Sequence, residues 1–165
     1  MAGSTTKKVV IRRFDRESLT GFVNPLTYLQ VEGLELLSPS GELSVVPYHE
    51  IKLVSFVREF GLPSANERKV FLSRPKINGL WVRMTFRDGE LLEGVLSNDL
   101  LQLPAQGFPL IPPDTSAGGQ RLFVPREAVT DFTVLGVVGG PAAKRKKAVP
   151  PREQIGLFEE GATQG

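Results

Sequence analysis

The sequence predicts an all-β fold in which two small antiparallel units follow one another along the chain. The clearest element is residues 81–94, WVRMTFRDGELLEG. Apolar and polar residues alternate in it with the period of a half-buried strand, and Asp88-Gly89 is typical of a hairpin turn. Gly94 lies inside the second strand, which indicates a bend or a close approach of another backbone.

The second observation is that the chain contains this order of features twice. Residues 9–21, VVIRRFDRESLTG, also run from an apolar strand through Phe and a polar turn to Leu and Gly. On this alignment Phe14 corresponds to Phe86, and the second hairpin is longer by one turn residue. Each half then closes with a Val-Pro pair between two apolar strands. We interpret this as a duplication; the alternative is the general similarity of β-hairpins.

The apolar periodicity also places the remaining strands. In the first unit we expect strands at 8–14, 19–24, 28–37, 43–46 and 51–57. In the second we expect them at 80–86, 91–96, 100–103, 108–111, 121–124 and 129–135, with one more in the connector at 69–72. After Gly139 the periodicity stops, which predicts disorder. The predicted parts are a flexible N-terminus, a first unit, a connector, a second unit and a disordered tail, at residues 1–6, 7–58, 59–77, 78–139 and 140–165.

Composition limits the class of protein. The 165 residues are 41% apolar, enough for a globular body, and two units of this size are expected to pack on each other. No apolar run approaches the length of a membrane span, and the start of the chain does not resemble a secretory signal. The chain has no Cys, so disulfides and thiolate chemistry are excluded and a cytoplasmic location is expected.

The positive charge is confined to one part of the sequence. The net charge is +2, yet residues 1–139 carry equal numbers of basic and acidic residues. The excess comes from the last segment, and above all from the run Lys144, Arg145, Lys146 and Lys147. This run is either a solvated, solubilising segment or a site of salt-sensitive contact with nucleic-acid phosphates.

Catalytic and metal-binding patterns are missing from the sequence. With a single His and no Cys, a zinc site would need carboxylates alone, which is unusual. There is no Gly-x-Ser-x-Gly elbow, no P-loop and no Gly-x-Gly-x-x-Gly loop. We therefore expect no enzymatic activity, no metal and no cofactor. The lone His49 is typical of a surface residue, and contact with nucleic acid is the alternative.

The second unit resembles the first motif of the Sm/LSm family, whose members are small, bent, five-stranded barrels of SH3-like shape. The residues that carry the resemblance are Val82, Phe86, Asp88, Gly89, Leu92, Gly94, Asn98, Asp99 and Leu101. Residues 124–135 are similar to the second motif of that family. The resemblance implies two Sm-like or SH3-like antiparallel barrels in tandem, followed by the disordered tail.

In the first unit, His49-Glu50-Ile51 is similar to the His-x-Ile of bacterial RNA chaperones of the same family. This implies that Tyr48 and His49 contact uridine-rich RNA. The sequence departs from the pattern at Tyr48, where the motif has Lys, and at Glu127, which takes the place of His49 in the second unit.

A different resemblance involves the arginines of the first hairpin. Arg12, Arg13 and Arg16, followed by Ser18 and Gly21, are superficially similar to the cyclic-di-GMP motif of PilZ domains, where guanidinium groups pair with phosphates. In that family the two parts of the motif are separated along the chain, and Arg16 stands where Asp or Asn is expected. This is the weakest of the alternatives.

The sharpest short motif lies in the tail. Residues 154–158, QIGLF, place three apolar side chains in a polar segment. The motif resembles the pentapeptide by which bacterial replication and repair proteins dock on the DNA polymerase sliding clamp. The matching residues are Gln154, Ile155, Leu157 and Phe158. The alternative is that these apolar side chains fold back onto the body of the protein.

Taken together, these patterns predict a non-enzymatic, cytoplasmic interaction module that is recruited to the sliding clamp by its tail. The alternatives are an Sm-like RNA-binding protein and an adaptor with a different partner.

Overall fold

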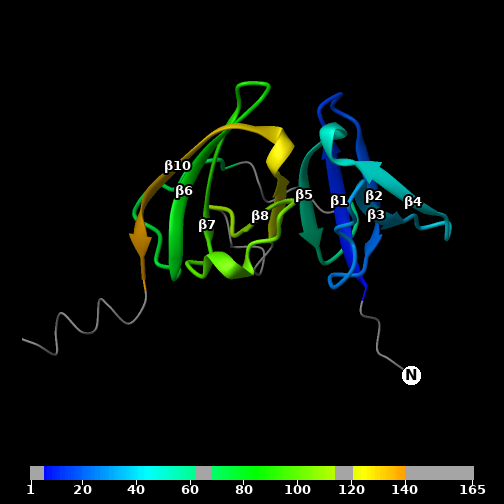
Figure 1. Ribbon diagram of the computed structural model, residues 1–165, viewed down its shortest axis with the longest axis horizontal. Coiled ribbons are helices and arrows are strands. Elements are labelled where there is room, and N and C mark those ends of the chain that lie inside the picture. The colour runs from blue at the N-terminus through cyan, green and yellow to red at the C-terminus, as the bar shows by residue number, and fades with distance from the viewer. Residues whose placement is uncertain (1–5, 62–67, 114–120, 140–165) are drawn as a thin grey trace, which may run out of the picture.

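The protein is all-β, and its sheets are antiparallel (Figure 1). The computed structural model describes residues 6–61, 68–113 and 121–139. The strands are β1 (Lys7–Arg13), β2 (Ser18–Val23), β3 (Gly33–Leu37), β4 (Leu43–Pro47), β5 (Ile51–Val57), β6 (Gly79–Phe86), β7 (Leu91–Leu96), β8 (Gly107–Leu110), β9 (Leu122–Pro125) and β10 (Val129–Val138). The same described residues include three short 3-10 helices, η1 (Tyr48–Glu50), η2 (Leu100–Gln102) and η3 (Arg126–Ala128).

The strands form two open sheets. One has seven strands in the order β4-β3-β2-β1-β5-β9-β8, and the other has three in the order β10-β6-β7. Neither sheet closes into a barrel, so the closed geometry implied by the Sm resemblance is not observed. The described residues contain no helix that is long and apolar enough to cross a membrane.

The two halves of the chain, β1 to β5 and β6 to β10, have the same strand order. In the first half the order is β4-β3-β2-β1-β5. In the second, β8 joins β7 through a bridge in which Val95 and Ile111 exchange both backbone hydrogen bonds at 3.0 Å. That bridge gives the order β9-β8-β7-β6-β10, which corresponds strand for strand to the first half.

The halves also share an irregularity of pairing. The register of β1 on β5 shifts so that Lys52 is left without a partner strand residue, and the register of β6 on β10 shifts in the same way at Thr130. Such a bulge bends the strand and increases its twist. Lys52 and Thr130 therefore occupy equivalent positions in the two halves.

The register corrects the alignment made from sequence. Ile11 faces Leu19 in the first hairpin and Met84 faces Leu92 in the second, so the hairpins have the same length. The amide of Phe14 donates to the carbonyl of Glu50, and the amide of Arg87 donates to that of Ala128. Phe14 is therefore equivalent to Arg87 and not to Phe86. The two Phe residues differ by one position along the strand, so the alignment that paired them is shifted by one residue.

A close backbone approach explains the glycine in the second strand of each hairpin. A Cβ on Gly21 would lie 2.5 Å from the carbonyl oxygen of Leu37 in β3. A Cβ on Gly94 would press against the Cδ1 methyl of Leu110 in β8 and lie 3.2 Å from the carbonyl oxygen of Ile111. The prediction of a close approach at Gly94 is thus confirmed, and the same constraint holds in the first half.

The halves meet where β5 pairs with β9, which we call the inner joint. Val54 faces Phe123 and Ser55 faces Leu122. Phe123, from the second half, lies in the apolar cluster of the first half with Val9, Ile11 and Leu34. Conversely, Leu53 of β5 lies in the cluster of the second half. Each half therefore contributes a strand side chain to the core of the other.

Three predicted strands differ from the structure. In the segment expected to form one long strand at 28–37, the strand begins only at Gly33, because the amide of Tyr28 donates to the carbonyl of Asn24 in a turn. The leucine-rich segment at 100–103 is the 3-10 helix η2, whose start is capped by the Asp99 side chain. Residues 69–72 form no strand.

The apolar phase of the strands predicts burial of four side chains, Phe14, Val54, Phe86 and Phe132, and two of the four are buried. Val54 and Phe86 are buried, as the alternation predicts. Phe14 and Phe132 are half-buried and pack against the apolar cluster of the second half.

Candidate functional site

A cavity of about 650 Å³ lies beside the inner joint and is lined by both halves. The first half contributes residues from the start of β1, the turn before β3 and the end of β5. The second half contributes Pro109 of β8, Arg121 just before β9 and Leu122 at the start of β9. A cavity of this volume is within the range that accepts a small molecule or a nucleotide.

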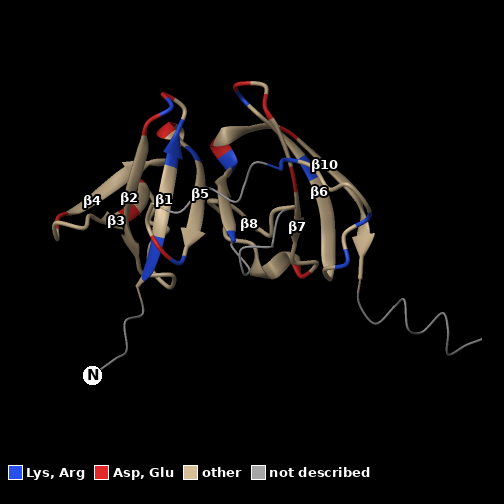
Figure 2. Cartoon of the chain, turned by 180° about the vertical axis from the view of Figure 1, so that it is seen from behind, with Lys and Arg blue, Asp and Glu red and all other residues tan. Residues whose placement is uncertain are grey.

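The polar wall of the cavity is basic. Lys7, Lys8, Arg58 and Arg121 line it, and none of the described residues that line it is acidic. Lys8 forms an ion pair at 2.9 Å with Glu59, next to the wall. Figure 2 shows β1 basic at both of its ends, and the Lys7–Lys8 end is the one at the cavity. The wall therefore favours an anionic ligand.

Two aromatic rings belong to the apolar wall, which also includes Pro25, Val57, Pro109 and Leu122. Tyr28 and Phe56 meet edge to face, with centroids 5.9 Å apart, and Tyr28 makes a similar contact with Phe123 of the second half at 6.0 Å. Burial, with a smaller effect of Tyr48, raises the pKa of Tyr28 to about 12. The Tyr28 hydroxyl is therefore neutral at physiological pH and adds no negative charge to the cavity.

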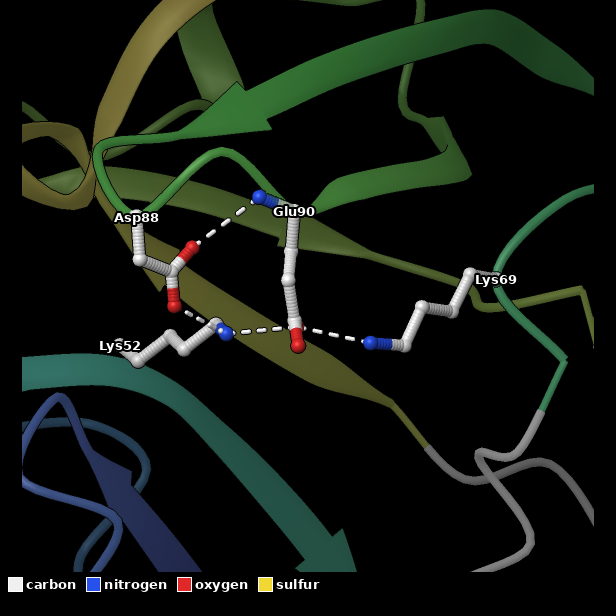
Figure 3. Close-up of polar contacts among 4 residues, drawn as sticks. All are labelled: Lys52, Lys69, Asp88 and Glu90. Carbon is white, nitrogen blue, oxygen red and sulfur yellow. Dashed lines mark hydrogen bonds and ion pairs between the residues drawn. The ribbon is translucent and has the colours of Figure 1, made fainter.

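A cluster of charged side chains ties the halves together near the other end of β5 (Figure 3). The ammonium group of Lys52 lies 2.6 Å from a carboxylate oxygen of Asp88 and 2.6 Å from one of Glu90, both in the β6–β7 turn. Lys69 of the connector reaches Glu90 at 2.7 Å. Lys52 is 6% exposed, so these two carboxylates are the ion pairs that its burial requires.

The electrostatics of this Lys52 cluster favour the ionised carboxylates. Hydrogen bonds from Lys52 and Lys69 lower the pKa of Glu90 to about 2. Burial raises the pKa of Asp88, but the hydrogen bond and the charge of Lys52, together with the hydrogen bond from the Glu90 amide, outweigh burial and lower it. A carboxylate with a lowered pKa is a weak base and holds no proton to donate as a general acid near neutral pH. We therefore assign the Lys52 cluster a structural role, in which it holds the two halves together.

Glu93 is a second buried carboxylate, 2% exposed on β7. It accepts hydrogen bonds from the Phe71 amide at 3.1 Å, from the Trp81 indole at 3.1 Å and from Arg83 at 2.9 Å. Burial raises its pKa, but these three donors outweigh burial and lower it. Because its lone pairs are occupied by protein donors, Glu93 also has a structural role.

The sequence-predicted site residues are not brought together in the described part of the chain. His49 is exposed in η1, and its backbone carbonyl accepts a hydrogen bond from the Arg87 side chain. Tyr48 is 8% exposed and donates from its hydroxyl to the carbonyl of Gln30 at 2.5 Å. Its ring belongs to the core of the first half, so in this arrangement it is not presented to a base.

The tail residues lie outside the described residues. These are the basic run Lys144, Arg145, Lys146 and Lys147 and the pentapeptide residues Gln154, Ile155, Leu157 and Phe158. Within the described ranges, no group of three or more His, Asp or Glu side chains is placed to hold a metal ion.

Sequence reasoning missed the cavity because its residues come from five separate segments. A local signal does exist, since Lys8, Arg58 and Arg121 each stand beside an apolar strand segment. What brings them together is the pairing of β5 with β9, and no short-range pattern encodes that pairing.

Fold and cavity define an all-β protein of two topologically equivalent halves with a basic, aromatic-walled pocket beside their joint. The chain belongs to a family that is described as a family of unknown function (DUF6982), which matches residues 5–136. No curated protein and no solved structure matches the chain.

Proposed function

We propose that the protein is a non-enzymatic interaction module of two Sm-like units that docks on the DNA polymerase sliding clamp through its tail. The observation that carries this proposal is the position of QIGLF. It begins at Gln154, beyond both the family match at 5–136 and β10, the last strand of the described residues, which ends at Val138. A docking peptide is most useful where it is separate from the fold that it recruits.

The expected docking mode is an extended peptide in an apolar pocket of the clamp. Leu157 and Phe158 would enter the pocket, each contributing about 1.5–3 kcal/mol by burial. Gln154 would fix the register through its amide donor and acceptor groups. Ordering the segment costs about 2–5 kcal/mol, so binding on the micromolar scale is expected.

The test compares full-length protein with the double variant Leu157→Ala, Phe158→Ala for binding to purified sliding clamp by surface plasmon resonance. We expect the double variant to lose clamp binding and to keep the wild-type melting temperature. The matched control, Glu159→Ala with Glu160→Ala, changes the same segment outside the pentapeptide and should bind as wild type. Undiminished clamp binding by the double variant, or a lowered melting temperature, would show that the segment is not a docking peptide.

A second candidate function, contact with single-stranded nucleic acid, is favoured by the cavity. Its basic wall of Lys7, Lys8, Arg58 and Arg121 suits phosphates, and the half-buried ring of Phe56 offers an apolar face for a base. This site differs from the one that the Sm resemblance implies, which uses His49.

Two variants separate these sites, each made in a full-length chain whose four tail cations are replaced by Gln. Binding of a uridine-rich RNA is measured by filter binding at low salt. If the cavity binds, Lys7→Ala with Arg121→Ala should weaken binding and reduce its salt dependence, while His49→Ala should have little effect. The reverse result would favour the His49 turn, and no RNA binding by the parent chain would exclude both.

A further inference from the structure

The inner joint is an asymmetric contact between two equivalent halves. It pairs the last strand of the first half, β5, with the fourth strand of the second half, β9, and includes a 2.9 Å hydrogen bond from the Phe56 amide to the Arg121 carbonyl. Because the halves have the same strand order, each has both kinds of edge. The joint uses β5 of the first half and β9 of the second. The other edge strand of each half, β4 in the first and β10 in the second, stays at the outside.

The two outer edges lie at opposite ends of the molecule, with β4 at one end and β10 at the other (Figure 1). Each is the terminal strand of its sheet in the described part of the chain. A terminal strand presents unpaired backbone donors and acceptors that can pair with another chain. The geometry therefore offers two strand-addition surfaces of complementary type.

Exposure distinguishes the outer edges from the inner joint. Counted back from Pro47 and Pro125, Val45 is equivalent to Phe123 and Ser44 to Leu122. Phe123 is 0% exposed and Leu122 1% exposed, whereas Val45 is 48% exposed and its neighbour Leu43 is 63% exposed. The positions that strand pairing buries on β9 thus have uncharged equivalents on β4, and on β4 these residues are exposed.

The same contrast holds on β10. Phe56, whose amide bonds β9, is half-buried, and its equivalent Val134 is 52% exposed. The segment 132–134 has no charged residue, and neither has β4, so the usual edge protection by Lys or Glu is missing from both. The side chain of Arg74 bonds the carbonyl of Val137, further along β10, and leaves this segment open.

We propose that a second copy of this chain adds its β10 to β4, repeating the inner joint between molecules. Phe132 would face Val45 and Thr133 would face Ser44, by equivalence with Val54–Phe123 and Ser55–Leu122. A contact of this head-to-tail kind leaves one free edge of each type on the pair, so it continues into a ring or a filament.

The intermolecular joint would be weaker than the inner one for an identifiable reason. At the inner joint Lys52 pairs with Asp88 and Glu90 of the β6–β7 turn. The equivalent residue on β10 is Thr130. Thr130 is uncharged, so it would form no ion pair with the β1–β2 turn of the neighbouring molecule. Association should therefore be reversible and dependent on concentration, and Thr130→Lys should strengthen it.

The test measures the mass of the full-length protein by sedimentation velocity over a concentration series, with no clamp or nucleic acid present. We expect a mass that rises above the 18.1 kDa monomer as concentration increases. Val45→Pro removes an outward-facing amide from β4, and Val134→Pro removes one from β10. Each variant alone should remain monomeric. The matched control Leu101→Lys, at a site that is 96% exposed and away from both edges, should associate as wild type.

An equimolar mixture of the two proline variants decides the geometry. Each retains one intact edge, so the mixture should form dimers of twice 18.1 kDa and nothing larger. If Val45→Pro does not retain the circular dichroism spectrum of the wild type, Leu43→Lys on the same edge replaces it. The proposal is overturned if wild type stays monomeric up to its solubility limit, if the edge variants associate as wild type, or if the mixture stays monomeric. Because no clamp is used, these outcomes are independent of the clamp proposal.

Discussion

The first hairpins of the two halves have the same register but different chemistry on one face. In the second half Arg83 faces Glu93, and the connector lies against this pair through the amide of Phe71. In the first half the equivalent pair is Val10 and Thr20, and Thr20 is exposed. Backbone constraints, in contrast, are shared: the bulge, the glycine in the second strand and the Pro before the 3-10 helix occur in both halves. The topology thus depends on backbone geometry and accepts either polar or apolar side chains on that face.

The largest effect should come from the shared glycines and should differ between the halves. Gly21→Ala places a Cβ against the backbone carbonyl of Leu37, whereas Gly94→Ala meets mainly the movable end of the Leu110 side chain. We expect a loss of about 3 kcal/mol in the free energy of unfolding for Gly21→Ala and about 1 kcal/mol for Gly94→Ala. Urea unfolding measures both. Equal losses would show that the close approach is not what selects glycine.

Glu93→Gln should test the polar face of the second half. The amide retains the shape but loses the charge that Arg83 pairs with, and its NH2 group opposes one of the donors that Glu93 now accepts from. We expect a loss of about 2 kcal/mol. Thr20→Val, at the equivalent exposed position, is the matched control and should change stability by less than about 0.5 kcal/mol. Differential scanning calorimetry compares them, and similar shifts in melting temperature would contradict the assignment.

A smaller effect is expected at the two bulges. Lys52→Met removes the cation that Asp88 and Glu90 share, but both carboxylates are more than a third exposed and remain hydrated. The loss should therefore be about 1 kcal/mol rather than the several expected for a fully buried pair. Thr130→Met at the equivalent bulge should be nearly neutral in dilute, monomeric protein. Chemical denaturation measures the free energy of unfolding of both variants. If Lys52→Met leaves it unchanged, the ion pairs of Lys52 do not stabilise the fold.

The pH dependence should report the same cluster. The pKa of Glu90 is about 2 in the folded state, below its ordinary value of 4.5, so the unfolded chain binds more protons between these values. The stabilisation is therefore complete above about pH 4.5 and is lost as the pH falls toward 2. Melting temperatures over this range should fall less steeply for Glu90→Gln than for wild type. Parallel curves would mean that the hydrogen bonds of Glu90 do not contribute.

Strand periodicity predicted most of the individual elements and none of the long-range pairing. The bounds of β5 and β7 were predicted to the residue, since each strand is mostly apolar and lies between clear turn signals. Residues 100–103 were assigned to a strand on their leucines, although Asp99 directly before them is a capping residue and marks a 3-10 helix. The local patterns were therefore informative where apolar period and turn chemistry agreed.

The cavity and the Lys52 cluster were beyond sequence reasoning for a physical reason. Lys52 sits between apolar neighbours, and only the position of the β6–β7 turn in space shows why a cation is buried there. The cavity depends on the register of β5 with β9, and register between distant strands is set by packing of the complete core. The tail motif is the opposite case, since it is legible in sequence and lies outside the described residues.

The contribution of Phe123 to the first core bears on the order in which this protein is synthesised and folded. Strand β5 leaves the ribosome long before β9 exists, so the first half waits with an open strand edge and without the aromatic side chain that fills its core. Closing such a distant contact is slow, because the loop entropy is lost before the contact forms. Until then the nascent chain presents a pairing-competent edge to neighbouring chains on the same message, and an early stop codon after β5 would produce an aggregating fragment rather than a smaller domain.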